Sequence, residues 1–186
     1  MNCWIRCLPL LAALGAASAQ APPAHAEPLR FGLAGGLLLP TQVRVGGRTA
    51  EARPGPIMVI TLDVPVIEAL DVGTFVQAGG FQAGDHTTDT VRTFEAGLGA
   101  HYRQPLGAGL LRLGVQVGYR QLAADLASYD RSHGLAINAD AEYSQRLYRA
   151  LHFQLRLGLL SQPFGGNAQH EVLLAPSPVL AVGVVL

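Results

Sequence analysis

The chain has 186 residues, of which 49% are hydrophobic and 14% are charged, with 22 glycines and a formal net charge of zero. This length suits one domain, and the balanced charge argues against nucleic-acid binding, which needs a basic surface. All 13 basic residues are arginine. Arginine pairs well with enclosed carboxylates, because its planar guanidinium forms two bonds at once. A genome rich in G and C would produce the same bias, and both explanations stay open.

Residues 1–26 have the pattern of a cleaved export signal. Arg6 precedes the apolar run "LPLLAALGAA", and small-residue cleavage patterns follow at 24–26 ("AHA") and, as an alternative, at 17–19 ("ASA"). The apolar run is too short to cross a membrane as a helix. Cleavage would remove both cysteines and the one tryptophan, Trp4. We therefore expect an exported bacterial protein whose mature part, residues 27–186, has no disulfide and no thiol nucleophile.

The mature part alternates apolar and polar residues, which predicts β-strands with two different faces. The first predicted strand, 29–39, is followed by a polar loop at 40–56. The second, 57–64, and the third, 70–81, are joined by a short link. The two faces of 70–81 are the least clearly separated.

Five more strands follow, at 92–104, 110–121, 135–146, 151–160 and 179–186. Pro176 and Pro178 stand before the last of them. Because proline has no backbone donor for a closed sheet, we expect a bulge there or a strand that begins near Val179.

The links between these strands alternate in length. Those at 40–56, 82–90, 122–134 and 161–171 are long, and those near 65–69, 105–109 and 147–149 are short. Membrane barrels alternate in this way, and about ten residues suffice for a tilted strand to cross a bilayer. The sequence predicts an all-β fold, an eight-stranded antiparallel up-and-down transmembrane β-barrel.

We expect the polar faces of the strands to point inward. The opposite arrangement would give an outer surface of glycines with few charges, which dissolves poorly, whereas inward glycines leave room for long polar side chains in a narrow barrel. The predicted polar network of the lumen is Arg30, Asp63, Glu95, His101, Arg103, Arg112, Gln116, Arg120, Asn138, Asp140, Glu142, Gln154 and Arg156. The predicted lipid-facing residues are Leu111, Leu113, Val115, Val117, Tyr119, Phe153, Leu155 and Leu157.

The short turns predict which interior residues meet. If Arg103 lies opposite Arg112 across the turn at 105–109, Glu95 lies opposite Arg120. A three-residue turn at 147–149 places Asp140 opposite Arg156. The predicted inward set holds five arginines and four acidic residues, so salt bridges can satisfy its buried charges. We expect this packing to plug the lumen, because eight strands enclose little more than side chains.

The export signal, the alternation in "FEAGLGAHYR" and "LLRLGVQVGYRQ" and the terminal "VLAVGVVL" make the chain resemble the small eight-stranded outer-membrane barrels of the OmpA/OmpX type. The resemblance covers nearly all of the mature chain and is one of pattern. The last strand of that family often ends in an aromatic residue, where this chain has Leu186. The resemblance implies a location in the bacterial outer membrane and an architecture more than an activity.

The leading hypothesis is therefore a non-enzymatic outer-membrane protein with a structural or surface-interaction role. The alternatives are a small passive pore, a lipid-modifying outer-membrane enzyme, and a soluble periplasmic barrel that binds an apolar lipid. The expected partners are outer-membrane lipid, the barrel-assembly machinery during biogenesis, and an unidentified extracellular partner at the long loops. We expect no nucleic acid and no cofactor, and the oligomeric state stays open.

Two loop groups contain residue types of functional sites. They are Asp85, His86 and Asp89, which suit a cation, and Asp130, Ser132 and His133, which suit a nucleophile triad. Adjacent serine and histidine seldom reach triad geometry, and solvated loops are the commoner explanation for both groups. We therefore predict no catalytic, cofactor-binding or metal site.

Overall fold

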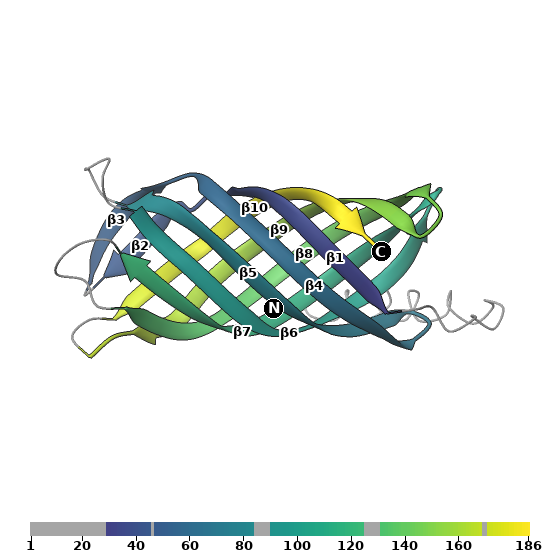
Figure 1. The fold of residues 1–186 in the computed structure, drawn as a ribbon. Coiled ribbons are helices and arrows are strands. Elements are labelled where there is room, and N and C mark those ends of the chain that lie inside the picture. Colours follow the sequence, from purple (N-terminus) through teal and green to yellow (C-terminus); the bar gives the residue numbers. More distant parts are fainter. Residues whose placement is uncertain (1–28, 46, 84–89, 125–130, 169–170) are drawn as a thin grey trace, which may run out of the picture.

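The computed structural model describes residues 29–45, 47–83, 90–124, 131–168 and 171–186. Its strands are β1 (Arg30–Leu38), β2 (Gln42–Val45), β3 (Arg48–Arg53), β4 (Gly55–Ile67), β5 (Leu70–Ala83), β6 (Thr90–Leu106), β7 (Gly109–Ala124), β8 (Ser132–Tyr148), β9 (Leu151–Gly166) and β10 (Val172–Val185). Eight of them, β1 and β4 to β10, form a closed antiparallel ring (Figure 1). The predicted eight-stranded up-and-down barrel is confirmed.

The ring closes between the first and last strands. Seven residue pairs join β1 to β10, from Gly32 opposite Val185 to Leu38 opposite Val179. Beyond them, the Phe31 amide donates to the Leu186 carbonyl at 3.1 Å, and the Leu186 amide donates to the Phe31 carbonyl at 2.9 Å. Closure gives the backbone groups of both terminal strands partners within the sheet, so that neither strand is left as an open edge.

The links divide the barrel into two different ends. The short links, 68–69, 107–108 and 149–150, lie at the end where the chain terminates, which we call the short-turn end. Arg149 and Gly107 have positive φ angles of 46° and 60°, as tight hairpin turns require. The strand ends that the longer links join lie at the opposite end, which we call the long-loop end (Figure 1).

The segment 40–56, predicted as a loop, contains the hairpin β2–β3, and that prediction is wrong. Gly47, with a φ of 82°, lies in its turn, and Val45 pairs with Arg48. Strand β2 pairs with β10 through Val43 and Leu174, and β3 pairs with β5. Beyond the last pair of β1 with β4, Leu38 opposite Gly55, the hairpin therefore continues the barrel wall between β10 and β5.

The sequence predicts either a bulge at Pro176 and Pro178 or a last strand that begins near Val179, and the structure shows the bulge. Strand β10 starts at Val172, and its register with β9 shifts between Leu174 and Ser177. The predicted bulge is confirmed, and a start near Val179 is wrong. The bulge accommodates Pro176, and the Pro178 carbonyl still accepts a hydrogen bond from the Leu39 amide at 2.8 Å.

One predicted register is found and the other is wrong. Glu95 lies opposite Arg120 in the pairing of β6 with β7. Arg156, however, lies opposite Glu142, two residues from the predicted Asp140. The turn between β8 and β9 has two residues instead of three, and the register shifts once more between Arg146 and Tyr148.

Candidate functional site

Strand β7 shows how the two faces of the barrel wall differ. The side chains of Leu113, Val115 and Val117 are 49%, 58% and 49% exposed. The side chains of Arg112 and Arg120 are 1% and 0% exposed. The apolar face is therefore the outside of the ring, and the charged face is the inside.

The outward apolar positions form a band of limited height. On β7 the band runs from Leu111 to Tyr119, and eight steps of about 3.4 Å, tilted by about 40°, rise about 21 Å. This is close to the roughly 25 Å apolar band of a membrane barrel. Of the other residues predicted to face lipid, Phe153 and Leu157 are exposed and Leu155 is half-buried.

The residues predicted to form the lumen network are all buried except Arg30, which is half-buried. Arg30 donates to the Ser144 hydroxyl at 3.4 Å. The others, apart from Gln154, belong to two groups of contacts, one centred on Glu95 and one on Arg112.

Glu95, on β6, is the acceptor at the centre of the first group. Its carboxylate accepts hydrogen bonds from Arg120 Nε at 2.8 Å, from Gln77 Nε2 at 2.6 Å and from Asn138 Nδ2 at 2.7 Å. Arg120 also donates to the Asn138 side-chain oxygen at 3.1 Å. Four strands, β5 to β8, thus meet at one fully buried carboxylate.

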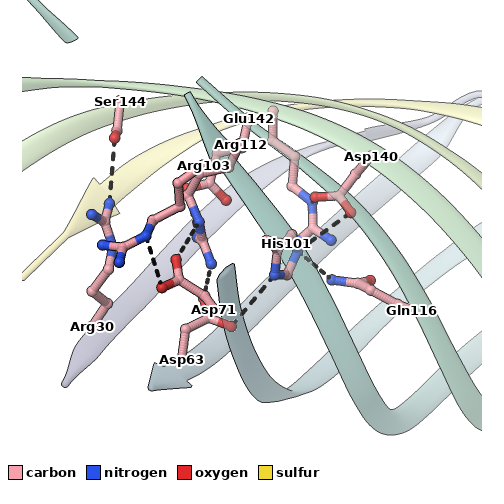
Figure 2. A network of polar contacts seen from close by, with 11 residues as sticks. Arg30, Asp63, Asp71, His101, Arg103, Arg112, Gln116, Asp140, Glu142 and Ser144 are labelled. Atoms are coloured by element: carbon pink, nitrogen blue, oxygen red, sulfur yellow. Dashed lines mark hydrogen bonds and ion pairs between the residues drawn. The ribbon is translucent and has the colours of Figure 1, made fainter. Parts of the chain in front are cut away.

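Arg112, on β7, is the donor at the centre of the second group (Figure 2). Its guanidinium lies 2.6 Å from Asp63 on β4, 3.1 Å from Asp71 on β5 and 3.0 Å from Glu142 on β8. A guanidinium presents five donors in a plane, so it can meet three carboxylates. Strand β4 is three places from β7 around the ring, so the contact to Asp63 crosses part of the interior.

His101 connects this second group to a fourth carboxylate. Its two ring nitrogens lie 3.6 Å from Asp63 and 3.5 Å from Asp140, and Arg156 Nε lies 3.2 Å from Asp140. Asp140 and Arg156 thus form an ion pair diagonally, although they are not opposite each other. Gly114 makes room for the imidazole, because a Cβ built there would overlap with the His101 ring and Asp140.

Asp71 is the interior charge that sequence reasoning missed. It is 0% exposed and lies 3.2 Å from Arg103 Nε as well as next to Arg112. With Asp71 included, the five inward arginines face five carboxylates. Asp71 and Gln77 are an even number of residues apart on β5, so they point to the same face, and this was the available signal. Phe75 and Phe81 also point to that inward face, so the face does not look polar in the sequence.

The interior is not polar throughout, which the sequence did not predict. Apolar side chains fill it near the long-loop end, where buried residues from eight strands form one cluster. Its members are Ala34, Leu38, Val43, Ile57, Val59, Phe81, Val91, Leu122, Leu160, Val172, Leu174, Val179 and Ala181. The charged groups lie in the middle and toward the short-turn end.

The candidate triad is not assembled. Ser132 is buried, whereas His133 points outward and stacks on the Tyr119 ring at 5.5 Å between centroids. Successive residues of a strand point to opposite faces, so these two side chains cannot act together. Asp130 lies outside the described residues.

The candidate cation site of Asp85, His86 and Asp89 and the export signal also lie outside the described residues. Within the described part of the chain, no three histidine, cysteine or acidic residues are placed to hold a metal. In the same residues, no helix is long and apolar enough to cross a membrane.

Comparison with known proteins gives structural relatives only. No family model matches the chain, and no curated protein matches its sequence. Neisserial surface protein A is 14% identical, with a TM-score of 0.61 over 86% of this chain and 99% of that one. The outer membrane protein OprG of Pseudomonas aeruginosa is 12% identical, with a TM-score of 0.58 over 85% of this chain and 95% of that one. The chain therefore has the fold of the small outer-membrane β-barrels.

Proposed function

We propose that this protein is an integral β-barrel of the bacterial outer membrane, with a structural or surface-interaction role and a lumen plugged by polar and charged side chains. The apolar outward band supports the membrane location, because water would otherwise cover a large apolar surface. The proposed export signal at residues 1–26 gives the route to that membrane.

The contacts of Arg112 are the observation that supports a plugged lumen most directly. They join β7 to β4, β5 and β8 through the interior, and each partner is buried. Ions that pass through this section would have to displace a guanidinium held by three carboxylates. Removing one partner of such a buried group costs about 3–5 kcal/mol, which opposes a permanently open path.

Conductance across planar lipid bilayers tests the plug. We expect no long-lived channel from the wild-type chain. We expect stable current steps from a variant that combines Arg112→Ser and Asp63→Ser, which remove two opposite charges, with Phe81→Ser and Leu174→Ser, which shorten the apolar cluster that lies in series with them. Arg146→Gln is the control, because Arg146 is exposed at the end of β8, and it should behave as the wild type. Long-lived, ohmic channels from the wild-type chain would replace the plug with the small-pore alternative.

The long loops are the proposed interaction surface, because the hairpin β2–β3 extends the wall at that end. The barrel-assembly machinery is the proposed partner during insertion, and membrane lipid is the proposed partner afterward.

The outward direction of His133 weighs against hydrolysis by Ser132. The buried charges and the apolar outside weigh against a soluble barrel that carries an apolar lipid.

A further inference from the structure

A shallow apolar groove of about 470 Å³ crosses the outward face of β6, β7 and β8. Leu98 and Tyr119, which are 64% and 61% exposed, stand beside the smaller Ala96. Ala96 lies opposite Tyr119, and Tyr119 lies opposite Leu135. The groove therefore follows one row of outward positions at the edge of the apolar band.

The outward positions next to this groove are basic toward the long-loop end. His133 lines the groove itself, Arg131 is exposed just before β8, and Arg92 is exposed on β6. The acidic residues that the structure describes on β6, β7 and β8 are Glu95, Asp140 and Glu142, and all three are buried inside. The described outward face of these strands thus carries only positive charge at this end.

The arrangement matches the shape of a lipid with an anionic headgroup. An apolar groove lies within the band that a membrane would cover, and basic side chains lie directly beyond it, where headgroups would be. The stack of His133 on Tyr119, with 18° between the ring planes, holds the imidazole at this boundary. A docked protein segment would need apolar surface beyond the groove as well, but the groove ends at His133 and the exposed Arg131 lies beyond it.

We propose that this surface binds a phosphate-bearing membrane lipid, with an acyl chain in the groove and the phosphate at Arg131 and His133. The inference rests on the proposed membrane location. Arginine forms paired hydrogen bonds with phosphate oxygens, and each basic residue near a membrane surface favours anionic lipid by about five-fold.

Quenching of a single tryptophan by brominated lipid measures this preference. The parent is the full chain with Trp4→Phe and Phe94→Trp. Phe94 is exposed opposite Gln121, which in turn lies opposite His133, and it does not line the groove. Vesicles contain phosphatidylcholine mixed with dibrominated phosphatidylglycerol or with dibrominated phosphatidylcholine. We expect phosphatidylglycerol to associate at least about five-fold more strongly, and less so at high salt.

Variants and a second reporter separate the outcomes. Arg131→Gln with His133→Gln should abolish the preference, and the exposed Arg146→Gln should keep it. An equal association of both lipids in the parent, or a preference unchanged in Arg131→Gln with His133→Gln, would overturn the proposal. Displacement of the lipid by inorganic phosphate would also overturn it, because the site would then recognise a free ion.

The control reporter, Phe153→Trp, lies on the outward face of β9. If this reporter is quenched and that of F94W is not, a protein covers the groove, and the lipid site is wrong. If neither reporter is quenched by any brominated lipid, the membrane location itself fails.

Discussion

Replacing Glu95 with glutamine tests the buried charge network. The substitution keeps the size of the side chain but removes the charge that faces Arg120. Three side chains donate to this carboxylate, at 2.6 to 2.8 Å, and the single oxygen of a glutamine cannot accept from all of them. Because Arg120 is 0% exposed, its charge would remain buried without a counterion. We expect the free energy of unfolding to fall by about 3–5 kcal/mol.

Urea unfolding in phosphatidylcholine vesicles, followed by the gel shift between folded and unfolded forms, measures this loss. The double variant Glu95→Gln with Arg120→Met removes both charges, and we expect it to lose less stability than Glu95→Gln alone. The coupling energy should reach about 2 kcal/mol or more. A cost of Glu95→Gln below about 1 kcal/mol, or a double variant that loses the sum of the two single losses, would refute the reasoning.

Three further changes follow from the same structure, each measured as the free energy of unfolding in vesicles. Val115→Arg, at the middle of the outward band, should cost about 2–4 kcal/mol, whereas Gln121→Arg beyond the band should cost less than about 1 kcal/mol; equal costs would contradict the band. Gly114→Ala should cost about 1–3 kcal/mol, because the added methyl overlaps with the His101 ring. Gly35→Ala, with open space around it, should stay within about 0.5 kcal/mol, and an equal effect at both glycines would contradict the close packing. Replacing the hairpin β2–β3 with a short glycine linker should leave a folded ring of lower stability, and a chain that no longer forms the heat-modifiable band would show that the hairpin is essential.

The strands could be predicted because their signals are local. Alternation with a period of two is visible within ten residues, and it locates the eight strands of the ring without knowledge of their neighbours. A tight turn also fixes the register of the two strands that it joins. The pairing of Glu95 with Arg120 followed from one such turn, whose actual residues are Gly107 and Ala108. The pairing of Asp140 with Arg156 failed because one turn residue and one bulge changed the count.

The hairpin β2–β3 could not be predicted in this way. Its strands have four and six residues, and they are stabilised by pairing with β10 and β5, which are distant in the sequence. Val43 is buried against the interior cluster only because the hairpin continues the wall. Its local sequence is polar enough to be read as a loop.

The apolar part of the interior was missed because strands β1, β4 and β10 are apolar on both faces toward the long-loop end. Ile57 and Val59 point inward while Met58 points outward, so alternation distinguishes nothing there. Asp71 was missed for a related reason, since aromatic residues share its inward face. The interior residues could thus be predicted from sequence where one face of a strand is clearly charged. Elsewhere, only the strand pairing of the closed ring shows which residues point inward.

The direction of the side chains on β7 tests the central claim most directly. Residues 27–186 contain no cysteine, so single cysteines can be placed at positions 112 to 117 of this part and spin-labelled in lipid vesicles. We predict that collisions with oxygen, which dissolves in the bilayer, alternate with a period of two and are highest for Leu113→Cys, Val115→Cys and Val117→Cys. Highest oxygen collisions at Arg112→Cys and Gln116→Cys, or collisions with a water-soluble nickel reagent at Val115→Cys, would contradict a barrel with its charges inside.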